Sequence, residues 1–460
     1  MSRNCYTPDM QKRHTDMLNG VIWKEILLFF FPIMFGSLFQ QLYNTVDAMV
    51  VGNFVGTGAL AAVGGSTGTV INLLVGFVVG LTSGATVVIA QAYGGNDLLS
   101  VRKGVSSGVL LAALMGIGMT ILGITAAPYI LHLLQVPEDI YGLSLQYMQI
   151  YMAGLLPTML FNTGAGILRA VGDSKRPLYF LIAATVINIV FDILFVAVMG
   201  FGIAGAAWAT VLAQSVSGIL TMVVLADKDA VYHFDYHLKA DWKMIAEIIR
   251  IGLPMGVQSV LYCISNLFIQ VAVNGFGTAT IAAWTAFGKI DALFWNYSNS
   301  LGTAVLTFIG QNYGAGNIRR LHKGVRTSIV MYVIISAAIT LFSLAAGSFL
   351  YRLFTPEADV ISIGMEMLKN LAPFWSTFCF VEILSQTMRA CGNSFGPTLI
   401  TGLAVAVLRI IWIVLIPHAT VFHALACYPV TWITASIVFI IYYVTGLWKR
   451  RITVKTAETK

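Results

Sequence analysis

Charged residues are scarce in this sequence. They make up 10% of its 460 residues, while hydrophobic residues make up 58%, whereas an ordinary soluble domain is roughly 25% charged. The longest polar stretch inside the chain, residues 226–243, is too short to form a core of its own. The composition leaves no room for an ATPase, kinase or receptor domain, and it indicates an integral membrane protein whose outer surface faces lipid.

Cysteine patterns and catalytic motifs are also missing. The five cysteines are scattered, with no Cys-x-x-Cys pair and no histidine at ligand spacing, which argues against a disulfide framework or a zinc site. The sequence contains no Gly-x-x-x-x-Gly-Lys-Ser/Thr loop and no His-Glu-x-x-His motif. We therefore expect neither an enzyme nor a bound cofactor. The apolar run behind the polar N-terminal residues is too long for a signal-peptide core, so we expect no cleaved leader.

Long apolar runs make up most of the chain. A transmembrane helix needs about 20 apolar residues, and twelve runs separated by turn residues are long enough. The sequence therefore predicts an all-α integral membrane protein with twelve transmembrane helices. The runs cover residues 26–50, 63–91, 105–127, 141–168, 177–199, 203–225, 245–273, 281–310, 325–350, 360–388, 397–416 and 424–447.

The positive charges predict how these helices are oriented. Most of the 27 Lys and Arg residues fall in the N-terminal segment, in alternate connections and in the C-terminal tail. Cytoplasmic segments of membrane proteins are enriched in these residues, so we expect a multi-pass protein of the cell membrane with both termini in the cytoplasm. The net charge of +7 follows from this topology, and we expect no nucleic-acid partner.

The chain contains an internal repeat at an offset of 220 residues. Residues 91–105 and 311–325 share six identities, and residues 169–177 and 389–397 share five. A six-helix unit repeats in the same orientation, and transporters use such halves to enclose a substrate and to rock around it. The predicted organisation is a cytoplasmic N-terminal segment (1–22), two pseudo-symmetric six-helix lobes (23–225 and 245–448), a linker (226–244) and a basic tail (449–460).

Two carboxylates interrupt the apolar runs of the first lobe. Asp47 lies in the first predicted helix, and Asp192 lies in the fifth, one helical turn after Asn188. A carboxylate inside the membrane is costly, so such a residue points to a function. Because the predicted spans of this lobe contain no Lys or Arg, we expect one acid to be protonated or the pair to hold a cation.

Other polar residues of this lobe could complete a site with the two acids. Amides and hydroxyls within a membrane also bond neighbouring helices, so a structural role is the alternative for each of them. The candidate cation ligands are Asp47, Asn188, Asp192, Thr210 and Ala206, and the candidate cavity residues are Gln40, Asn44, Tyr147 and Asn162.

The repeat supplies an internal control for the two acids. Asp47 pairs with Ile269 and Asp192 pairs with Trp412, so only one copy carries them, which is unexpected if they served the packing of the shared fold. The second lobe carries charges of both signs, which could balance as two ion pairs. We expect this set to be structural, with binding of a drug cation or a proton by one of its acids as the alternative. The set consists of Lys289, Asp291, Glu382 and Arg409.

A proline also recurs in the repeat. Pro32 and Pro254 each lie early in the first helix of their half. Proline removes one backbone hydrogen bond and strains the preceding turn. We therefore expect Pro32 to act as a hinge.

Several motifs resemble one family of transporters. The stretch Tyr43-Asn44-Thr45-Val46-Asp47, followed by Val51-Gly52-Asn53 and Gly56, resembles the first helix of multidrug and toxic compound extrusion (MATE) transporters. The Gln-x-Tyr-Gly loops at Gln91 and Gln311 and the loop from Leu168 to Asp173 resemble the same family. The resemblance covers nearly the whole chain. It implies twelve helices in two lobes and an exchange of drugs against sodium or protons.

Within this family, the chain resembles the DinF-like branch, in which an acid on the first helix couples cation movement to transport. The resemblance implies a sodium or proton site at Asp47 and at the helix-five pair Asn188 and Asp192, with Thr210 and Ala206 at the helix-six positions. It also implies pocket positions at Tyr147 and Asn162 and a bend at Pro32. The other bacterial branch uses acids on helices seven and ten, and this sequence has no acid after Glu247 on helix seven and no clear match at Glu382. The resemblance therefore carries no cation site over to the second lobe.

Other functions have less support. A lipid-linked oligosaccharide flippase of the same superfamily would need cationic residues in its cavity, whereas the first lobe offers acids. A channel would show a pore-lining polar repeat and a membrane enzyme a reactive cluster, and the sequence shows neither. Five oxygen ligands favour sodium as the coupling ion, although two neighbouring acids could share a proton instead. The expected partners are the lipid bilayer and small, often cationic organic compounds, and we expect a monomer.

Overall fold

The structure, a computed structural model, describes residues 15–235 and 241–449. Within these ranges the chain is almost entirely helical and contains no β-strand. It folds into two compact units. Unit 1 comprises the described residues of Met1–Gly20 and Leu28–Gly256, and unit 2 comprises those of Val21–Leu27 and Val257–Lys460.

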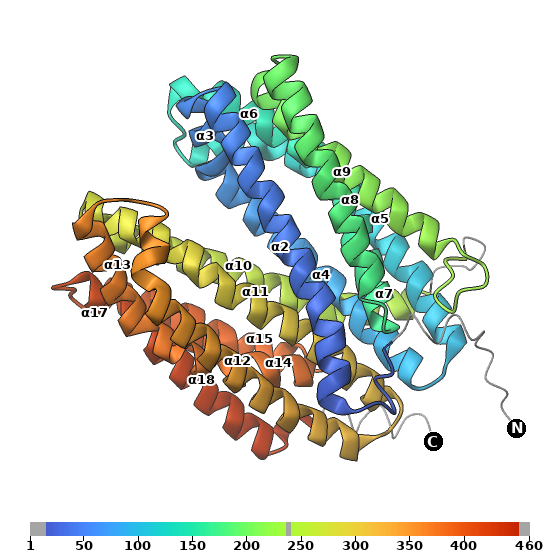
Figure 1. Ribbon diagram of the computed structural model, residues 1–460. Helices are drawn as coiled ribbons and strands as arrows, with labels where there is room; N and C mark the ends of the chain where they lie inside the picture. Colours follow the sequence, from blue (N-terminus) through green and yellow to red (C-terminus); the bar gives the residue numbers. More distant parts are fainter. Residues whose placement is uncertain (1–14, 236–240, 450–460) are drawn as a thin grey trace, which may run out of the picture. The chain divides into compact units, whose positions relative to one another are not determined.

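The helices of unit 1 are coloured from blue to green in Figure 1. Most of them are long enough to cross a membrane. A short π-helical segment, η1, lies between α8 and α9. The elements are α2 (Ile22–Phe54, whose first residues belong to unit 2), α3 (Thr57–Gly64), α4 (Ser66–Gly94), α5 (Leu98–Leu133), α6 (Glu138–Ala153), α7 (Leu155–Ala170), α8 (Lys175–Asp192), η1 (Ile193–Val198) and α9 (Gly202–Leu225).

The helices of unit 2 run from yellow to red in Figure 1. Two of its spans are interrupted, one by a 3₁₀ segment (η2) and one by a π-helical segment (η3). The elements are α10 (Trp242–Asn274, shared with unit 1), α11 (Thr278–Gly314), α12 (Ile318–Arg352), α13 (Ala358–Leu371), η2 (Ala372–Phe378), α14 (Cys379–Ala390), α15 (Phe395–Thr401), η3 (Gly402–Val407), α16 (Leu408–Leu415), α17 (Val421–Leu425), α18 (Cys427–Val444) and the 3₁₀ turn η4 (Leu447–Lys449).

Each of the twelve predicted runs falls on one helix or on a group of consecutive helical segments. By length and apolar composition, nine helices among the described residues qualify as membrane spans, or ten if α6 and α7, bent by 46°, form one span. The other two runs, 281–310 and 360–388, fall on α11 and on the interrupted helix from α13 to α14. The predicted all-α membrane architecture is confirmed.

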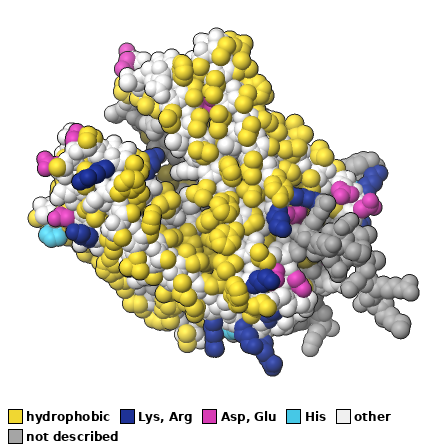
Figure 2. All heavy atoms as spheres, in the orientation of Figure 1, with side chains coloured by type: hydrophobic (Ala, Val, Ile, Leu, Met, Phe, Trp, Pro, Cys, Tyr) yellow, Lys and Arg dark blue, Asp and Glu magenta, His cyan; other side chains and the backbone are white. Residues whose placement is uncertain are grey.

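Large apolar side chains cover the outside of the protein. Figure 2 shows hydrophobic side chains over much of the visible surface, with few charged side chains among them. On α5, for example, Leu122 is 66% exposed and Leu133 is 82% exposed. Such a surface matches the hydrocarbon of a bilayer and would be unfavourable in water.

Parts of the predicted organisation lie outside the described residues. Residues 1–14, 236–240 and 450–460 are not described, so the predicted N-terminal segment, linker and basic tail are described only in part. The sequence boundaries between the compact units fall inside α2 and α10. The division into lobes 23–225 and 245–448, with a linker between them, stays a prediction.

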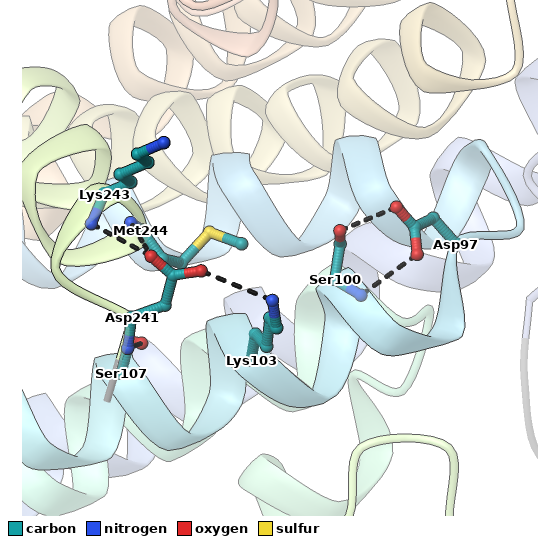
Figure 3. A network of polar contacts seen from close by, with 7 residues as sticks. All are labelled: Asp97, Ser100, Lys103, Ser107, Asp241, Lys243 and Met244. Carbon is teal, nitrogen blue, oxygen red and sulfur yellow. Dashed lines mark hydrogen bonds and ion pairs between the residues drawn. The ribbon is translucent and has the colours of Figure 1, made fainter. Parts of the chain in front are cut away.

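The repeated loop at residues 91–105 and 311–325 forms the same turn twice. Asn96 and Gly316 occupy equivalent positions, and both have positive φ angles, of 56° and 71°. The next residue begins a helix in each copy. Asp97 accepts a hydrogen bond from the N–H of Ser100 at 3.0 Å (Figure 3), and Asn317 caps α12 in the same way at 3.1 Å. The sequence identities of this loop therefore reflect one turn-and-cap geometry.

The second repeated loop also has one geometry in both copies. Gly172 and Gly392 have φ angles of 95° and 91°, a region that favours glycine. The side chains that follow, Asp173 and Asn393, accept hydrogen bonds from backbone N–H groups three residues later, at 3.1 and 3.2 Å. The same backbone requirement explains why these residues recur.

Two glycine pairs bring α4 and the first part of α10 into backbone contact within unit 1. A Cβ atom at Gly84 would lie 2.2 Å from the carbonyl oxygen of Ile248, and one at Gly80 would lie 2.4 Å from the nitrogen of Gly256. On α10, Gly252 and Gly256 take the facing positions. Both helices thus use the Gly-x-x-x-Gly spacing that allows membrane helices to approach closely.

Candidate functional site

The five predicted cation ligands are all buried in unit 1. Asn188 and Asp192 are fully buried and lie one turn apart on α8, and Asp47 on α2 is 7% exposed. Ala206 and Thr210 are buried one turn apart on α9. Asp192 is also the residue at which α8 passes into the π-helical segment η1, and π turns are frequent at functional sites.

A contact between α2 and α8 brings the two acids to the same level. The Thr185 hydroxyl donates a hydrogen bond to the backbone oxygen of Phe39 at 3.4 Å. As the first and fifth spans, α2 and α8 run in the same direction. Asp47 lies about two turns beyond Phe39, and Asp192 lies about two turns beyond Thr185. The carboxylates are close enough for their charges to interact.

A second contact sets the register of α9. The side-chain amide of Gln214 donates to the Tyr43 hydroxyl at 3.2 Å, and both residues are buried. Because α9 runs opposite to α2, Thr210, one turn before Gln214, lies level with Asp47, one turn after Tyr43. Helices α8 and α9 also pack directly against each other. The structure therefore places Asp47, Asp192 and Thr210 at one level among α2, α8 and α9, and Asn188 and Ala206 lie one turn away on α8 and α9.

The polar atoms of this cluster are buried without hydrogen-bond partners. Buried polar groups in folded proteins nearly always have a partner, so a concentration of exceptions marks a place where a ligand or ion would bind. In the described part of the chain, such atoms include Asp47 Oδ1, both carboxylate oxygens of Asp192, both side-chain polar atoms of Asn188, and Thr210 Oγ1.

The donors of this cluster fit a hard cation or a proton. Carboxylate, amide and hydroxyl oxygens suit hard ions such as sodium, whereas transition metals favour imidazole and thiolate ligands. Within residues 15–235 and 241–449, no three or more His, Cys, Asp or Glu residues form a metal-binding group. The oxygen cluster therefore fits sodium or a proton, and Asp47 and Asp192 would carry the charge.

Two ion pairs of unit 1 lie at helix ends. Lys103 Nζ lies 3.5 Å from Asp241 Oδ2, where Asp241 also accepts backbone hydrogen bonds from the first turn of α10 (Figure 3). A second ion pair joins Asp173 to Arg176 in the turn before α8. No described Lys or Arg pairs with Asp47 or with the acid on α8. The buried acids thus lack a protein cation.

The predicted cavity residues differ in how they are placed. Tyr147 is 4% exposed and lies within electrostatic range of both acids. Gln40 is half-buried and Asn44 is exposed, one turn apart on α2. The amide of Asn162 donates to a backbone carbonyl of its own helix at 2.8 Å. The structure brings Tyr147 to the acids, and the cavity role of the other three stays a prediction.

Three further polar residues near the acids are not among the predicted cation ligands or cavity residues. Tyr43 and Gln214 form the hydrogen bond that joins α2 to α9, and the ring of Tyr151 lies 6.2 Å from that of Tyr147. A glutamine in the middle of an apolar run is costly in a membrane. That cost was the signal in the sequence that could have identified Gln214.

Pro32 lies inside α2, which continues through it as one helix. The residue is half-buried, and its neighbours Phe31 and Phe35 are exposed. Close packing therefore does not hold this turn on all sides. Its role as a hinge stays a prediction.

The two ion pairs that the sequence allows in unit 2 do not form among its described residues, and the structural role of the four charges stays a prediction. None of the four residues of the predicted set lies within ion-pair distance of a described opposite charge. Lys289 is exposed, whereas Asp291, two positions later, bonds with Trp295 on the inner side of α11. Residues two apart on a helix do not share a face, which explains why Lys289 is separated from this acid.

The other charges of this set are bound to neutral polar groups. Glu382 accepts a hydrogen bond from Gln386 at 2.9 Å, and Arg409 donates to Asn266 at 3.1 Å. A Cβ atom at Gly302 would come within 1.9 Å of the Glu382 carboxylate. The absence of a side chain at Gly302 therefore makes the space that this acid occupies.

Sequence comparison places the two halves in one family. The profile of the MatE family matches residues 32–194 and again residues 254–415, one match in each half. The chain belongs to the MatE family. Members of this family are membrane transporters, so the protein is a multi-pass membrane protein of a transporter family and not an enzyme.

Relatives in this family match almost the full length of the chain. The chain is 29% identical over 443 residues to "Probable multidrug resistance protein YpnP" of Bacillus subtilis, covering 94% of this chain and 97% of the relative. It is 23% identical over 445 residues to "Probable multidrug resistance protein NorM" of Thermotoga maritima, covering 94% of each.

Solved structures share the fold. "Outward-facing conformation of a multidrug resistance MATE family transporter of the MOP superfamily" has a TM-score of 0.87 at 23% identity and covers 96% of this chain and 98% of that chain. "Crystal structure of MATE in the bent conformation" has a TM-score of 0.86 at 22% identity and covers 97% and 99%. These similarities confirm the predicted MATE-type fold.

Proposed function

We propose that the protein is a secondary active multidrug efflux transporter. It exports bulky, often cationic organic compounds across the cell membrane in exchange for sodium or protons, by alternating access of its two lobes. The observation that carries this proposal is the cluster of unpartnered buried oxygens at Asp47, Asn188 and Asp192. The names of the MatE relatives, which include multidrug resistance proteins, support the same function.

The cluster gives the coupling ion a physical role. Two interacting carboxylates without a protein cation favour the binding of a positive ion. When the ion leaves, the two negative charges repel, so the loaded and empty states favour different arrangements of α2 and α8. Sodium is the preferred ion because the cluster offers several neutral oxygens, and protons can substitute for it at the two acids.

The flippase alternative has less support at this site. A lipid-linked pyrophosphate would need cationic side chains around it, and the cluster around Asp47 holds acids and neutral polar groups. The proposed transporter works as a monomer in the bilayer with both termini in the cytoplasm, and it binds small organic compounds and no nucleic acid.

Inverted membrane vesicles that contain the protein test this function. Ethidium uptake is measured after imposing a sodium gradient, a pH gradient, or neither, with vesicles lacking the protein as control. A tenfold gradient of either ion supplies about 1.4 kcal/mol, enough for about tenfold accumulation, and we expect the sodium gradient to drive the larger uptake. Equal uptake with and without gradients would overturn secondary active transport.

A further inference from the structure

A pocket between α12 and α13 of unit 2 contains two positive side chains. The pocket has a volume of about 670 Å³, and Arg352 and Lys369 both line it. The other lining residues are neutral and comprise Ser348, Pro356, Ala358, Ile361, Ser362 and Met365. Neither cation lies within ion-pair distance of a described acid. The pocket therefore presents two positive charges that no lining residue balances.

The packing of the two antiparallel helices fixes the walls of this pocket. The Tyr351 hydroxyl donates to the backbone oxygen of Gly364 at 2.8 Å, and both residues are buried. A Cβ atom at Gly347 would lie 2.6 Å from Met365 Sδ, so the helices are also close one turn away. Beside this contact, residues three or four positions apart share one face of each helix. These pocket-lining residues are Ser348 and Arg352 on α12 and Ser362, Met365 and Lys369 on α13.

The two cations lean toward each other along the helix axes. Because Tyr351 contacts Gly364, the next residue, Arg352, lies about one and a half turns from the level of Lys369. Side chains on an α-helix tilt toward its N-terminus. Since the helices are antiparallel, this tilt directs Arg352 toward the level of Lys369 and directs Lys369 toward the level of Arg352. One anionic group between them can therefore contact both.

Lys369 lies deep in its predicted membrane span. It is in the last turn of α13, about three turns after the helix begins at Ala358. A lysine at such a depth extends its side chain toward the polar surface of the bilayer. On α12 beside the pocket, Phe349 is 65% exposed and Leu353 is 64% exposed. A ligand that fits this place has a polar group for the cations and an apolar part for these side chains, as a phospholipid does.

The matching positions of unit 1 do not carry this pair of cations. At the offset of 220 residues, Arg352 matches His132 and Lys369 matches Gln149. Arg352 is also the single Lys or Arg in the predicted connections on the side opposite the termini, where positive residues are uncommon. The repeated fold therefore does not require the two cations, and their position points to a ligand with negative charge.

We propose that this pocket binds the phosphate group of an anionic phospholipid from the outer leaflet of the membrane. The phosphate accepts hydrogen bonds from Arg352, from Lys369 and from the two serine hydroxyls, and the acyl chains pack against the exposed apolar side chains of α12. Charge-assisted hydrogen bonds from arginine and lysine are strong contacts to phosphate, and basic pockets between membrane helices bind anionic head groups. The site does not depend on transport, and only the choice of leaflet follows from the proposed orientation.

Charge and depth select this occupant. An organic cation would be repelled by two positive groups that have no acid beside them. A zwitterionic phospholipid brings a positive group of its own into the pocket, so it should bind less tightly. Free phosphate would lose hydration in a partly apolar pocket and would leave the apolar side chains beside it without a contact.

Native mass spectrometry of the purified protein in detergent tests this site. The protein is titrated with phosphatidylglycerol and, separately, with phosphatidylcholine that has the same acyl chains. We expect the double variant Arg352→Gln/Lys369→Gln to bind phosphatidylglycerol at least about tenfold more weakly than the wild type, because charge-assisted hydrogen bonds are lost. Phosphatidylcholine should bind equally to both proteins. Equal affinity of the wild type and the double variant for phosphatidylglycerol would overturn the site.

Two further variants separate the pocket from a general attraction between charges. Arg319→Gln/Lys323→Gln removes two exposed cations from the other end of α12 and should weaken the binding of phosphatidylglycerol much less. An equal loss in both double variants would overturn the site. Ser362→Trp keeps both pocket cations but fills the pocket, and it should weaken binding several-fold. Because Ser362 is exposed, this variant also decides the matter if Arg352→Gln/Lys369→Gln does not fold, since binding at the wild-type affinity would contradict the pocket.

Inorganic phosphate distinguishes the lipid from a free anion as the occupant. Phosphate is added in excess to the protein with bound phosphatidylglycerol, and we expect the lipid to stay bound. Displacement of the lipid would show a site for free anions and would overturn the lipid as occupant. Ethidium uptake plays no part in these measurements. Lipid binding through the pocket in a protein without gradient-driven uptake would therefore retain the site and overturn the proposed function, and the reverse result would retain transport and overturn the site.

Discussion

The two units contain the same repeated helices but place different charges at matching positions. In unit 1, Asp47 and Asp192 are buried with unpartnered oxygens. At the matching positions of unit 2, Ile269 is buried, and Trp412 donates its indole N–H to a backbone carbonyl at 2.9 Å. The fold therefore does not need the acids, since one copy forms without them. Burying a carboxylate inside the membrane costs free energy, so acids that the fold does not require point to a function.

The loops show the opposite relationship between the copies. Asn96 and Gly316 both take a positive φ angle, and Asp97 and Asn317 both cap the next helix. Here the residue types are shared because both copies need the same backbone geometry. Agreement between the units thus identifies what the fold requires, and disagreement identifies residues that are free to serve a function.

The strongest test of this difference is removal of the first acid. We expect Asp47→Asn to insert and fold normally but to lower ethidium efflux to the level of cells without the protein, because the cation cluster loses a charge. Efflux is measured by the loss of fluorescence from preloaded cells, with Asp97→Asn, a change to an exposed acid outside the cluster, as the matched control. Efflux at the wild-type rate would show that Asp47 does not couple cation movement to export.

The second acid separates the two possible ions. We expect Asp192→Asn to keep part of its transport and to lose stimulation by sodium more than it changes the pH profile, because sodium needs the negative charge. Vesicle uptake is recorded against sodium concentration and, separately, against pH. If sodium never stimulates the wild type and the variant loses only proton-driven uptake, the site is a proton site.

Replacing each of the two matching prolines, Pro32 and Pro254, should have a smaller effect on transport than replacing the acids. Pro32→Ala should slow transport several-fold at normal expression, because it restores a backbone hydrogen bond and stiffens α2. Pro254→Ala should change the rate less, since Gly252 and Gly256 hold that turn of α10 against α4. Turnover is measured in vesicles at matched protein amounts. Equal effects of the two substitutions would contradict a hinge specific to Pro32.

The smallest expected difference concerns the two helix caps. Asp97→Ala and Asn317→Ala should each lower the stability of the purified protein by about 1 kcal/mol at neutral pH. Hydrogen bonds from the side chain and backbone N–H of Ser100 lower the pKa of Asp97. The stability that the Asp97 cap contributes is therefore fully present above the ordinary pKa of aspartate, about 3.9. This stability is lost as the pH falls through the lowered pKa of Asp97 in the folded protein.

Thermal unfolding at several pH values measures this difference. The difference in stability between the wild type and Asp97→Ala should disappear in acid. The difference in stability between the wild type and Asn317→Ala should persist, because an amide does not titrate in this range. Parallel pH dependence of both variants would mean that the Asp97 carboxylate does not make the cap.

The sequence by itself determined the helices, the repeat and the candidate acids. Apolar runs of this length have few stable structures in lipid other than helices, so composition was sufficient to predict their places. Asp47 and Asp192 could be singled out because a carboxylate among apolar neighbours is costly wherever the chain places it. The recurring loop residues followed from backbone geometry, which depends on only a few neighbouring residues.

Only the tertiary structure decided which distant side chains meet. The charges of unit 2 do not form the ion pairs that the sequence allows, because pairing depends on which face of each helix packs inward. Lys289 and Asp291 are two residues apart but point to different surroundings. Arg409 on α16 donates to Asn266 on α10, and no local pattern in the sequence records the register of these two helices. Local patterns fix the elements of this protein, and the packing of helix faces fixes its sites.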